Sequence, residues 1–312
     1  DYIMSFPGHF KDHILPNQIA HLSVSFLVDS LQRQRGGCAP NIAYSLALLG
    51  NRPRIMATAG KDFTDYQRWL EGVGVDTSLM AIYEDEFTAS FFVSTDRDNN
   101  QIASFYTGAM ARARELSFYD LNRSEIDLVI ISPNDPEAMV KYARECRELG
   151  IAYIYDPSQQ IIRLEPRHLV EGIAGARMLI VNDYELEMIK RKVGLTETEI
   201  VNMTPTLVVT RGEQGSEIVE NHQTIPIPAA PPERVADPTG VGDAYRGGVI
   251  TGLTRGYRWE VSGRMGSLAA TYALEQPGPQ NHRYTVPEFV ERYRRYFGDT
   301  PELADLLLSA HR

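Results

Sequence analysis

The sequence has few cysteines, no long apolar run and no excess of positive charge. Its cysteines, Cys38 and Cys146, are too few for a disulfide framework and lack the CxxC spacing of a zinc site. A reducing, cytoplasmic setting is therefore the simplest expectation. The longest apolar stretches, 128–131 and 179–181, fall far below the roughly 20 residues that span a bilayer. No basic leader followed by an apolar region marks a signal peptide, so we predict no membrane association.

The balance of charge also limits the choice of partners. A net charge of −10, with no basic run of five or more residues, disfavours a nucleic-acid-binding surface. Any anionic ligand must then be held locally, and the free N–H groups of a helix N-terminus provide such a site without net positive charge.

What the sequence does contain is the pattern of an α/β protein. Its 312 residues, 43% of them apolar, suffice for a large core, and no segment repeats or is of low complexity. From about residue 127 onward, β-rich apolar runs alternate with helical patterns. This alternation predicts a doubly wound, mostly parallel sheet flanked by helices, within a single domain over 1–312.

One helix is predicted in detail over 135–149. Asp135 is a suitable N-cap, Pro136 fits the first helical position, and Gly150 provides the stop. The apolar stripe of this helix includes Cys146, which identifies that cysteine as a core residue.

The first hundred residues show a different, alternating pattern. Val24, Phe26 and Val28 alternate with polar residues, and two further runs, 88–94 and 101–106, flank a turn-forming segment. We predict a small antiparallel β lid built from about 20–35 and 86–108. One apolar face of this lid would need a ligand or a second subunit to cover it.

A glycine-rich loop enters a helical pattern in the segment 237–253. Gly240 and Gly242 can place successive N–H groups around an anion, and the start of the helix adds a partial positive charge. Asp243 follows directly, where its carboxylate can accept a proton from an attacking hydroxyl. Taken alone, Asp243 is equally well explained as an N-cap residue.

A second paired-glycine loop precedes another helical pattern, in 35–50. Gly36 and Gly37 permit a close backbone approach, and Asn41 lies in the first turn of the helix. Its amide can bond a substrate hydroxyl or simply the loop.

Together these two segments resemble the ribokinase family, also called the PfkB carbohydrate kinases, over nearly the whole chain. The N-terminal family pattern is matched by Gly36, Gly37, Ala39, Asn41, Ala43, Gly50 and Gly60. The C-terminal pattern is matched by Asp237, Pro238, Gly240, Gly242, Asp243, Gly247 and Gly248. The resemblance implies an ATP-dependent phosphotransferase that acts on a hydroxymethyl group.

The resemblance also implies roles for individual residues. Asp243 would be the general base, and the amides of Gly240, Val241 and Gly242 would hold the γ-phosphoryl group. Gly36, Gly37, Asn41 and Asp1 would bind the substrate. Asn182 and Glu185 match an NxxE element that orders Mg²⁺ through water. Thr210, Gly212, Gly215 and Gly278 match nucleotide-binding positions.

Two positions depart from the family pattern. Val241 stands where a small residue is usual, and Pro279 interrupts a stretch that lies near the adenine and a monovalent cation, so K⁺ is an open requirement. The openings of the chain and of 101–110 resemble nucleoside kinases, adenosine kinase especially. Aromatic residues of the predicted lid, Phe26, Phe91, Phe92, Phe105 and Tyr106, would contact the base or else pack within the lid or a homodimer.

Three alternatives remain at this point. A sugar kinase acting on ribose or fructose fits the same motifs. A sugar- or nucleoside-binding protein without activity is supported only by Val241 and Pro279. A dinucleotide-binding dehydrogenase is disfavoured, because no GxGxxG opens a helix after an early strand.

Overall fold

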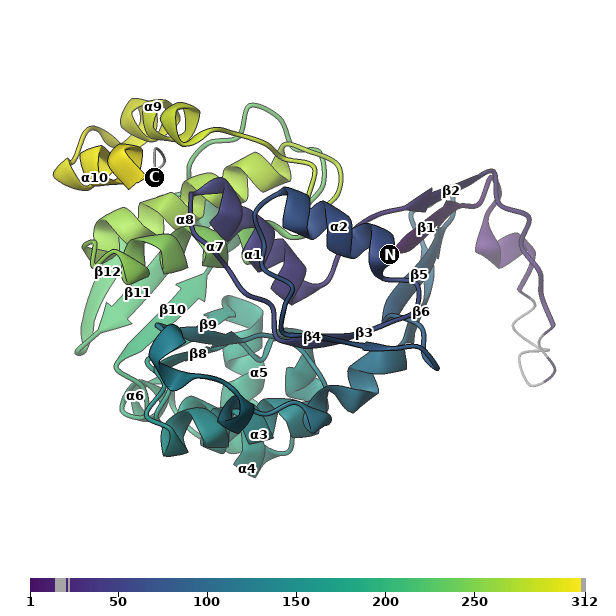
Figure 1. The fold of residues 1–312 in the computed structure, drawn as a ribbon. Helices are drawn as coiled ribbons and strands as arrows, with labels where there is room; N and C mark the ends of the chain where they lie inside the picture. The colour runs from purple at the N-terminus through teal and green to yellow at the C-terminus, as the bar shows by residue number, and fades with distance from the viewer. Residues whose placement is uncertain (15–20, 22, 310–312) are drawn as a thin grey trace.

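The central element of the computed structural model, which describes residues 1–14, 21 and 23–309, is a six-stranded sheet (Figure 1). Its order is β12-β11-β10-β9-β8-β7. The parallel strands are β7 (Val129–Ile131), β8 (Tyr153–Tyr155), β9 (Met178–Asn182) and β10 (Thr206–Thr210). The antiparallel strands β11 (Ser216–Glu220) and β12 (Gln223–Ile227) continue it. The mostly parallel sheet is thus confirmed.

Helices cover both faces of this sheet, as Figure 1 shows. One layer contains α3 (Pro136–Glu148), α4 (Pro166–Ile173) and α5 (Asp183–Val193), and the other contains α1 (Cys38–Leu48), α7 (Val241–Thr254) and α8 (Trp259–Leu274). Side chains of β9 alternate between the layers: Leu179 and Val181 pack with the first, Met178 and Ile180 with the second. The strands are therefore apolar on both faces. Within the described ranges, no helix combines the length and apolarity needed to cross a membrane.

The remaining helices complete the outer shell. They are α2 (Thr64–Gly72), α6 (Glu197–Val201), α9 (Val286–Phe297) and α10 (Pro301–Ser309). The C-terminal pair α9 and α10 packs beside α8 and shares its apolar cluster.

The helix predicted over 135–149 is confirmed as α3. Asp135 caps it, because its Oδ1 accepts the N–H of Ala138 at 3.1 Å. Cys146 is fully buried within the layer, and Gly150 follows the helix with a φ of +63°.

A separate four-stranded sheet stands to one side of the molecule (Figure 1). Its order is β2-β1-β5-β6, from β1 (Tyr2–Ser5), β2 (Ser30–Arg33), β5 (Ser90–Thr95) and β6 (Gln101–Tyr106). The pairs β1–β2 and β5–β6 are antiparallel, as the sequence predicts, whereas β1 and β5 pair in parallel. The short strands β3 (Ala57–Gly60) and β4 (Met80–Tyr83) form a parallel pair between the two larger sheets.

The strand predicted around Val24, Phe26 and Val28 is wrong. Residues 23–28 form no strand, and the β2 ladder begins only at Ser30; positions 20 and 22 of the predicted lid lie outside the described residues. The ring of Phe26 instead lies edge-on to Phe6 and Phe10, with centroids 5.1 and 4.8 Å away. Aromatic packing against the preceding segment therefore determines the conformation here.

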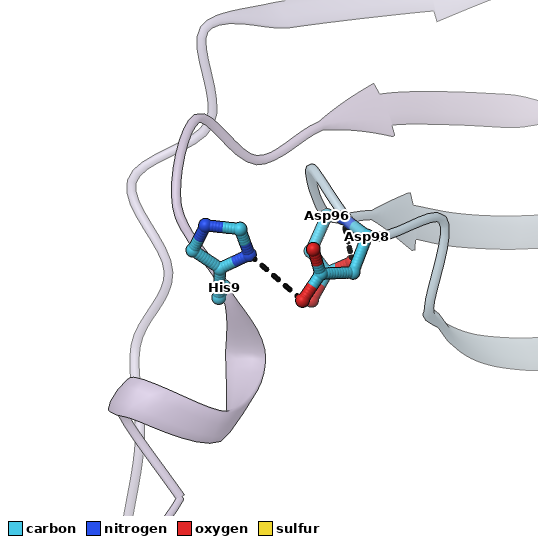
Figure 2. A group of neighbouring side chains, drawn as sticks. All are labelled: His9, Asp96 and Asp98. Carbon is cyan, nitrogen blue, oxygen red and sulfur yellow. Dashed lines mark hydrogen bonds and ion pairs between the residues drawn. The ribbon is translucent and has the colours of Figure 1, made fainter.

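The tip of the β5–β6 hairpin is fixed by hydrogen bonds. Asn99 has a φ of +62°, which confirms the predicted turn, and Asp96 accepts the N–H groups of Phe10, Asp98 and Asn100. Figure 2 shows His9 facing Asp98, with Nδ1 and Oδ2 3.0 Å apart. Because both oxygens of Asp96 already accept protein N–H groups, this cluster is a structural turn that ties the N-terminal segment to the hairpin.

Candidate active site

The site is built around the N-terminus of α7. Gly240 is its N-cap in the left-handed region, with a φ of +78°, and a methyl group there would come within 2.4 Å of Pro279 Cβ. Only glycine fits both requirements. The N–H groups of Gly242 and Asp243 have no acceptor among the described residues. They lie at the positive end of the helix dipole, an arrangement suited to an anion.

Asp243 is not a helix cap. It lies in the first turn after the Gly240 cap, and its Oδ2 accepts a hydrogen bond from Asn41 Nδ2 at 2.8 Å. Burial raises the pKa of Asp243 to about 7, while the charge of Arg246 and the Asn41 bond act in the opposite direction. A carboxyl group with this pKa can exchange a proton with a substrate hydroxyl near neutral pH.

Asn41 is oriented from its other side by residues that the sequence analysis did not identify. Gln280 Nε2 donates to Asn41 Oδ1 at 2.7 Å and to the Tyr66 hydroxyl at 2.6 Å. Tyr66 in turn donates to the carbonyl of Gly36 at 3.0 Å. The departure at Pro279 drew attention away from Gln280, its buried neighbour. The polarity of Gln280 in that stretch was the available signal.

The paired glycines lie at the wall of a cavity of about 730 Å³. Gly37 is the N-cap of α1 with a φ of +98°, and Gly36 lies so close to Asp1 that a methyl group would come within 2.3 Å of Asp1 Oδ2. Asp1 lines the cavity, and its amino group donates to the carbonyl of Gln34 at 2.9 Å. The structure thus brings Asp1, Gly36 and Gly37 together.

This cavity adjoins Asp243 through Cys38, which lines it. Burial raises the pKa of the Cys38 thiol, and the negative charge of Asp243 raises it further. Aromatic rings line the cavity as well, from Phe63, Tyr66 and Phe105. Of the aromatic residues predicted for the lid, Phe105 is the one placed in this lining, whereas Phe92 stacks on Tyr2 at 4.7 Å.

The carboxyl ends of the parallel strands contribute the next group of residues. Asn182 ends β9 in register with Thr210 on β10. Asn182 and Glu185 form a reciprocal capping box on α5, and Glu185 Oε1 also accepts from Ser158 Oγ at 3.0 Å. Glu185 is therefore a fixed carboxylate, and its charge raises the pKa of Asp243. Ligand sites of open α/β sheets lie at this edge.

The remaining nucleotide-binding candidates lie further from the base. Gly212 and Gly215 form the turn between β10 and β11, and among the described residues no hydrogen bond connects them to Asp243. The N–H of Gly278 donates to Asp237 Oδ2 at 2.9 Å, which holds the stretch after α8 against the Gly240 turn.

A buried ion pair behind the base also escaped the sequence analysis. Arg246 Nη2 bonds Asp156 Oδ1, and both side chains are buried. Burial raises the pKa of Asp156 to about 6, against the effect of Arg246. The signals were an arginine three residues after Asp243 on an otherwise apolar helix and an aspartate at the end of a strand.

Comparison with known proteins agrees with this geometry. The model of the pfkB family carbohydrate kinases matches residues 11–285. A nucleoside kinase of Methanocaldococcus jannaschii is 30% identical, over 88% of this chain and 90% of its own. The structure of a Burkholderia thailandensis nucleoside kinase in complex with inosine is 35% identical, with a TM-score of 0.87 over 96% of this chain and 97% of that one. The chain therefore belongs to the PfkB family of carbohydrate kinases and is a phosphotransferase with a hydroxyl acceptor.

Proposed function

We propose that this protein is a nucleoside kinase that transfers the γ-phosphoryl group of ATP to the 5′-hydroxymethyl of a nucleoside, adenosine being the favoured acceptor. One observation carries the proposal: the buried carboxylate of Asp243 lies beside two open N–H groups and is bonded to Asn41, which belongs to the loop along the cavity.

The chemistry follows from these positions. Asp243 takes the proton of the acceptor hydroxyl as the oxygen attacks, and the N–H groups of Gly242 and Asp243 stabilise the charge on the transferring phosphoryl group. Gly240 gives the turn its shape, and Val241 contributes backbone only. Because its side chain points along the helix and packs with the α8 cluster, we expect Val241 to be tolerated.

Acceptor binding is assigned to the cavity. Asp1, Gly36 and Gly37 would bind the sugar hydroxyls, with Asn41 orienting the base at the reacting end. A cavity of about 730 Å³ with Phe63 and Phe105 in its wall suits a nucleoside better than a free sugar. The relatives with nucleoside kinase names, and the inosine and ADP-inosine complexes of the Burkholderia protein, support the same choice.

Magnesium fits the charge of the site. The carboxylates of Asp156, Glu185 and Asp243 act on one another beside the single positive charge of Arg246, which leaves a net negative pocket. Glu185, through water, would hold the ion, and the ion would neutralise the phosphates. ATP would extend from there toward Asn182, Thr210, Gly212, Gly215 and Gly278.

The four-stranded sheet would act as a lid over the acceptor and as a surface for a second copy. By the strand register, Tyr2, Phe92, Ile102 and Tyr106 share one face of it, and the last three are exposed. Light scattering across a concentration series tests the homodimer; one chain mass throughout would contradict it.

A substrate panel tests the function. Adenosine, inosine, cytidine, ribose and fructose are compared with MgATP, with Na⁺ replacing K⁺ in one series. We expect the highest kcat/KM on a nucleoside; saturable turnover on a free sugar alone would favour the sugar kinase. Asp243→Asn should lower kcat by orders of magnitude while nucleoside binding, measured by calorimetry, persists. Turnover like that of the wild type would show that another group is the base.

A further inference from the structure

The ion pair between Arg246 and Asp156 has a position that stability alone does not explain. Both side chains are buried in the layer below the α7 turn, and Arg246 Nε and Asp156 Oδ2 have no hydrogen-bond partner in the described part of the chain. A buried pair with unmet hydrogen-bonding capacity is a weak source of stability, because desolvation offsets much of the attraction. Its retention here indicates a role in the site.

The geometry of α7 directs Arg246 at the catalytic turn. Residues three and four apart share a face of a helix, so Arg246 lies on the face of Asp243 and of Gly242. A methyl group on Gly242 would come within 2.8 Å of Arg246 Nη1. The guanidinium therefore lies directly against the backbone whose N–H groups are open, and Gly242 leaves room for it.

The charges around Asp243 come from four elements. Cys38 and the amide of Asn41 face it from α1, Asp156 from the end of β8, and Glu185 from α5. The fifth group, Arg246 on α7 itself, is the single positive charge among them. Burial opposes the charge of Arg246, but Asp156 and Asp243 outweigh this effect and raise the pKa of the guanidinium.

We propose that Arg246, held in place by Asp156, is a positioning residue that presents a fixed positive charge to Asp243 and to the backbone turn opening α7. Arg246 keeps the base anionic in a buried setting that favours the neutral acid, and Asp156 fixes the guanidinium and moderates its effect. The inference rests on the proposed role of Asp243 as the base.

The two partners have opposite charges, so their removal has opposite effects. Arg246→Met takes a positive charge away from Asp243, which raises the pKa of the base. Asp156→Asn takes away a negative charge and leaves Arg246 unneutralised, which lowers it. A pair with a purely structural role would instead reduce activity in both variants without moving the pH profile.

The experiment is the pH profile of kcat/KM with MgATP and a saturably phosphorylated nucleoside. The midpoint of the acid limb is expected to rise by about one pH unit in Arg246→Met and to fall by about one in Asp156→Asn. Arg246→Lys keeps the charge and should stay near the wild-type midpoint. Shifts of both variants in one direction, or no shift in either, overturn the proposal.

Two controls separate folding and base assignment from the inference. Arg292→Met breaks a second buried pair, with Glu275 at 2.6 Å between α8 and α9, and should lower the unfolding temperature without moving the profile. If Arg246→Met does not fold, Asp156→Asn and Arg246→Lys still decide. In Asp243→Asn the acid limb should disappear; a limb that persists there shows that the base assignment is wrong, whichever way the pair variants shift.

Discussion

The glycine at the N-cap of α7 can be tested with a matched glycine at the other end of the same helix. Gly240 and Gly256 have similar backbones, with φ of +78° and +70°. They differ in their surroundings, because a methyl group on Gly256 meets nothing within 4 Å, whereas one on Gly240 comes within 2.4 Å of Pro279 Cβ. Alanine at the two positions therefore separates backbone strain from steric overlap.

The expected magnitudes follow from these two terms. Gly256→Ala should lower the unfolding free energy by about 1–2 kcal/mol, the cost of a left-handed alanine. Gly240→Ala adds an overlap of about 1–3 kcal/mol, for a total of about 2–5 kcal/mol. Since the overlap also displaces the open N–H groups of the turn, kcat should fall in Gly240→Ala and stay near wild type in Gly256→Ala.

Urea unfolding and steady-state kinetics measure both effects. Adding Pro279→Gly to Gly240→Ala removes the overlapping Cβ, and the double-mutant cycle should recover about the overlap energy as a coupling between the two positions. Equal destabilisation by the two alanine variants, with activity retained in both, would refute the argument that Pro279 and Gly240 together shape the phosphate turn.

Three further predictions concern charge, orientation and capping. Burial raises the pKa of Asp243 to about 7 from an ordinary value near 4, so its contribution to stability is present below that ordinary value and is lost as pH rises through 7. Asp243→Asn should therefore raise the unfolding temperature at pH 8 more than at pH 5; a pH-independent difference would contradict this. Gln280→Leu leaves Asn41 Oδ1 without its donor and should reduce kcat/KM about 10- to 100-fold, equivalent to about 1–3 kcal/mol, with the unfolding temperature as the control for folding; an unchanged value would remove Gln280 from the site. Thr285→Ala removes the N-cap that accepts the N–H of Glu288 and should lower the unfolding free energy by about 1 kcal/mol with kcat unchanged; a fall in kcat would mean that α9 influences the site.

The fold was predictable wherever local patterns coincide with tertiary packing. The alternation after residue 127 gave the parallel sheet correctly because those strands are apolar on both faces. The cap at Asp135 gave the start of α3 for the same reason of local sufficiency. The strand expected at 23–29 failed because Phe26 satisfies its packing against Phe6 and Phe10, a contact that alternation cannot reveal.

The site was predictable only as far as its motifs reach. The glycine loops located Asp243 and Asn41, but the hydrogen bond between them depends on how α1 and α7 pack. Gln280, Tyr66, Asp156 and Arg246 act through contacts with distant residues, and no local periodicity marks such contacts. Burial of a polar side chain is the property that identifies them, and that property requires the structure.

The chain of bonds from Gly36 through Tyr66, Gln280 and Asn41 to Asp243 has a consequence for the timing of folding. Asn41 and Asp243 are separated by 202 positions, and Asn41 and Gln280 by 239. Contacts of such long range form late, because loop closure must precede them. During synthesis the site stays incomplete until the segment around Gln280 has emerged, so unfinished chains lack an oriented base and cannot waste ATP. Recovery of activity on refolding should accordingly lag behind recovery of helical structure.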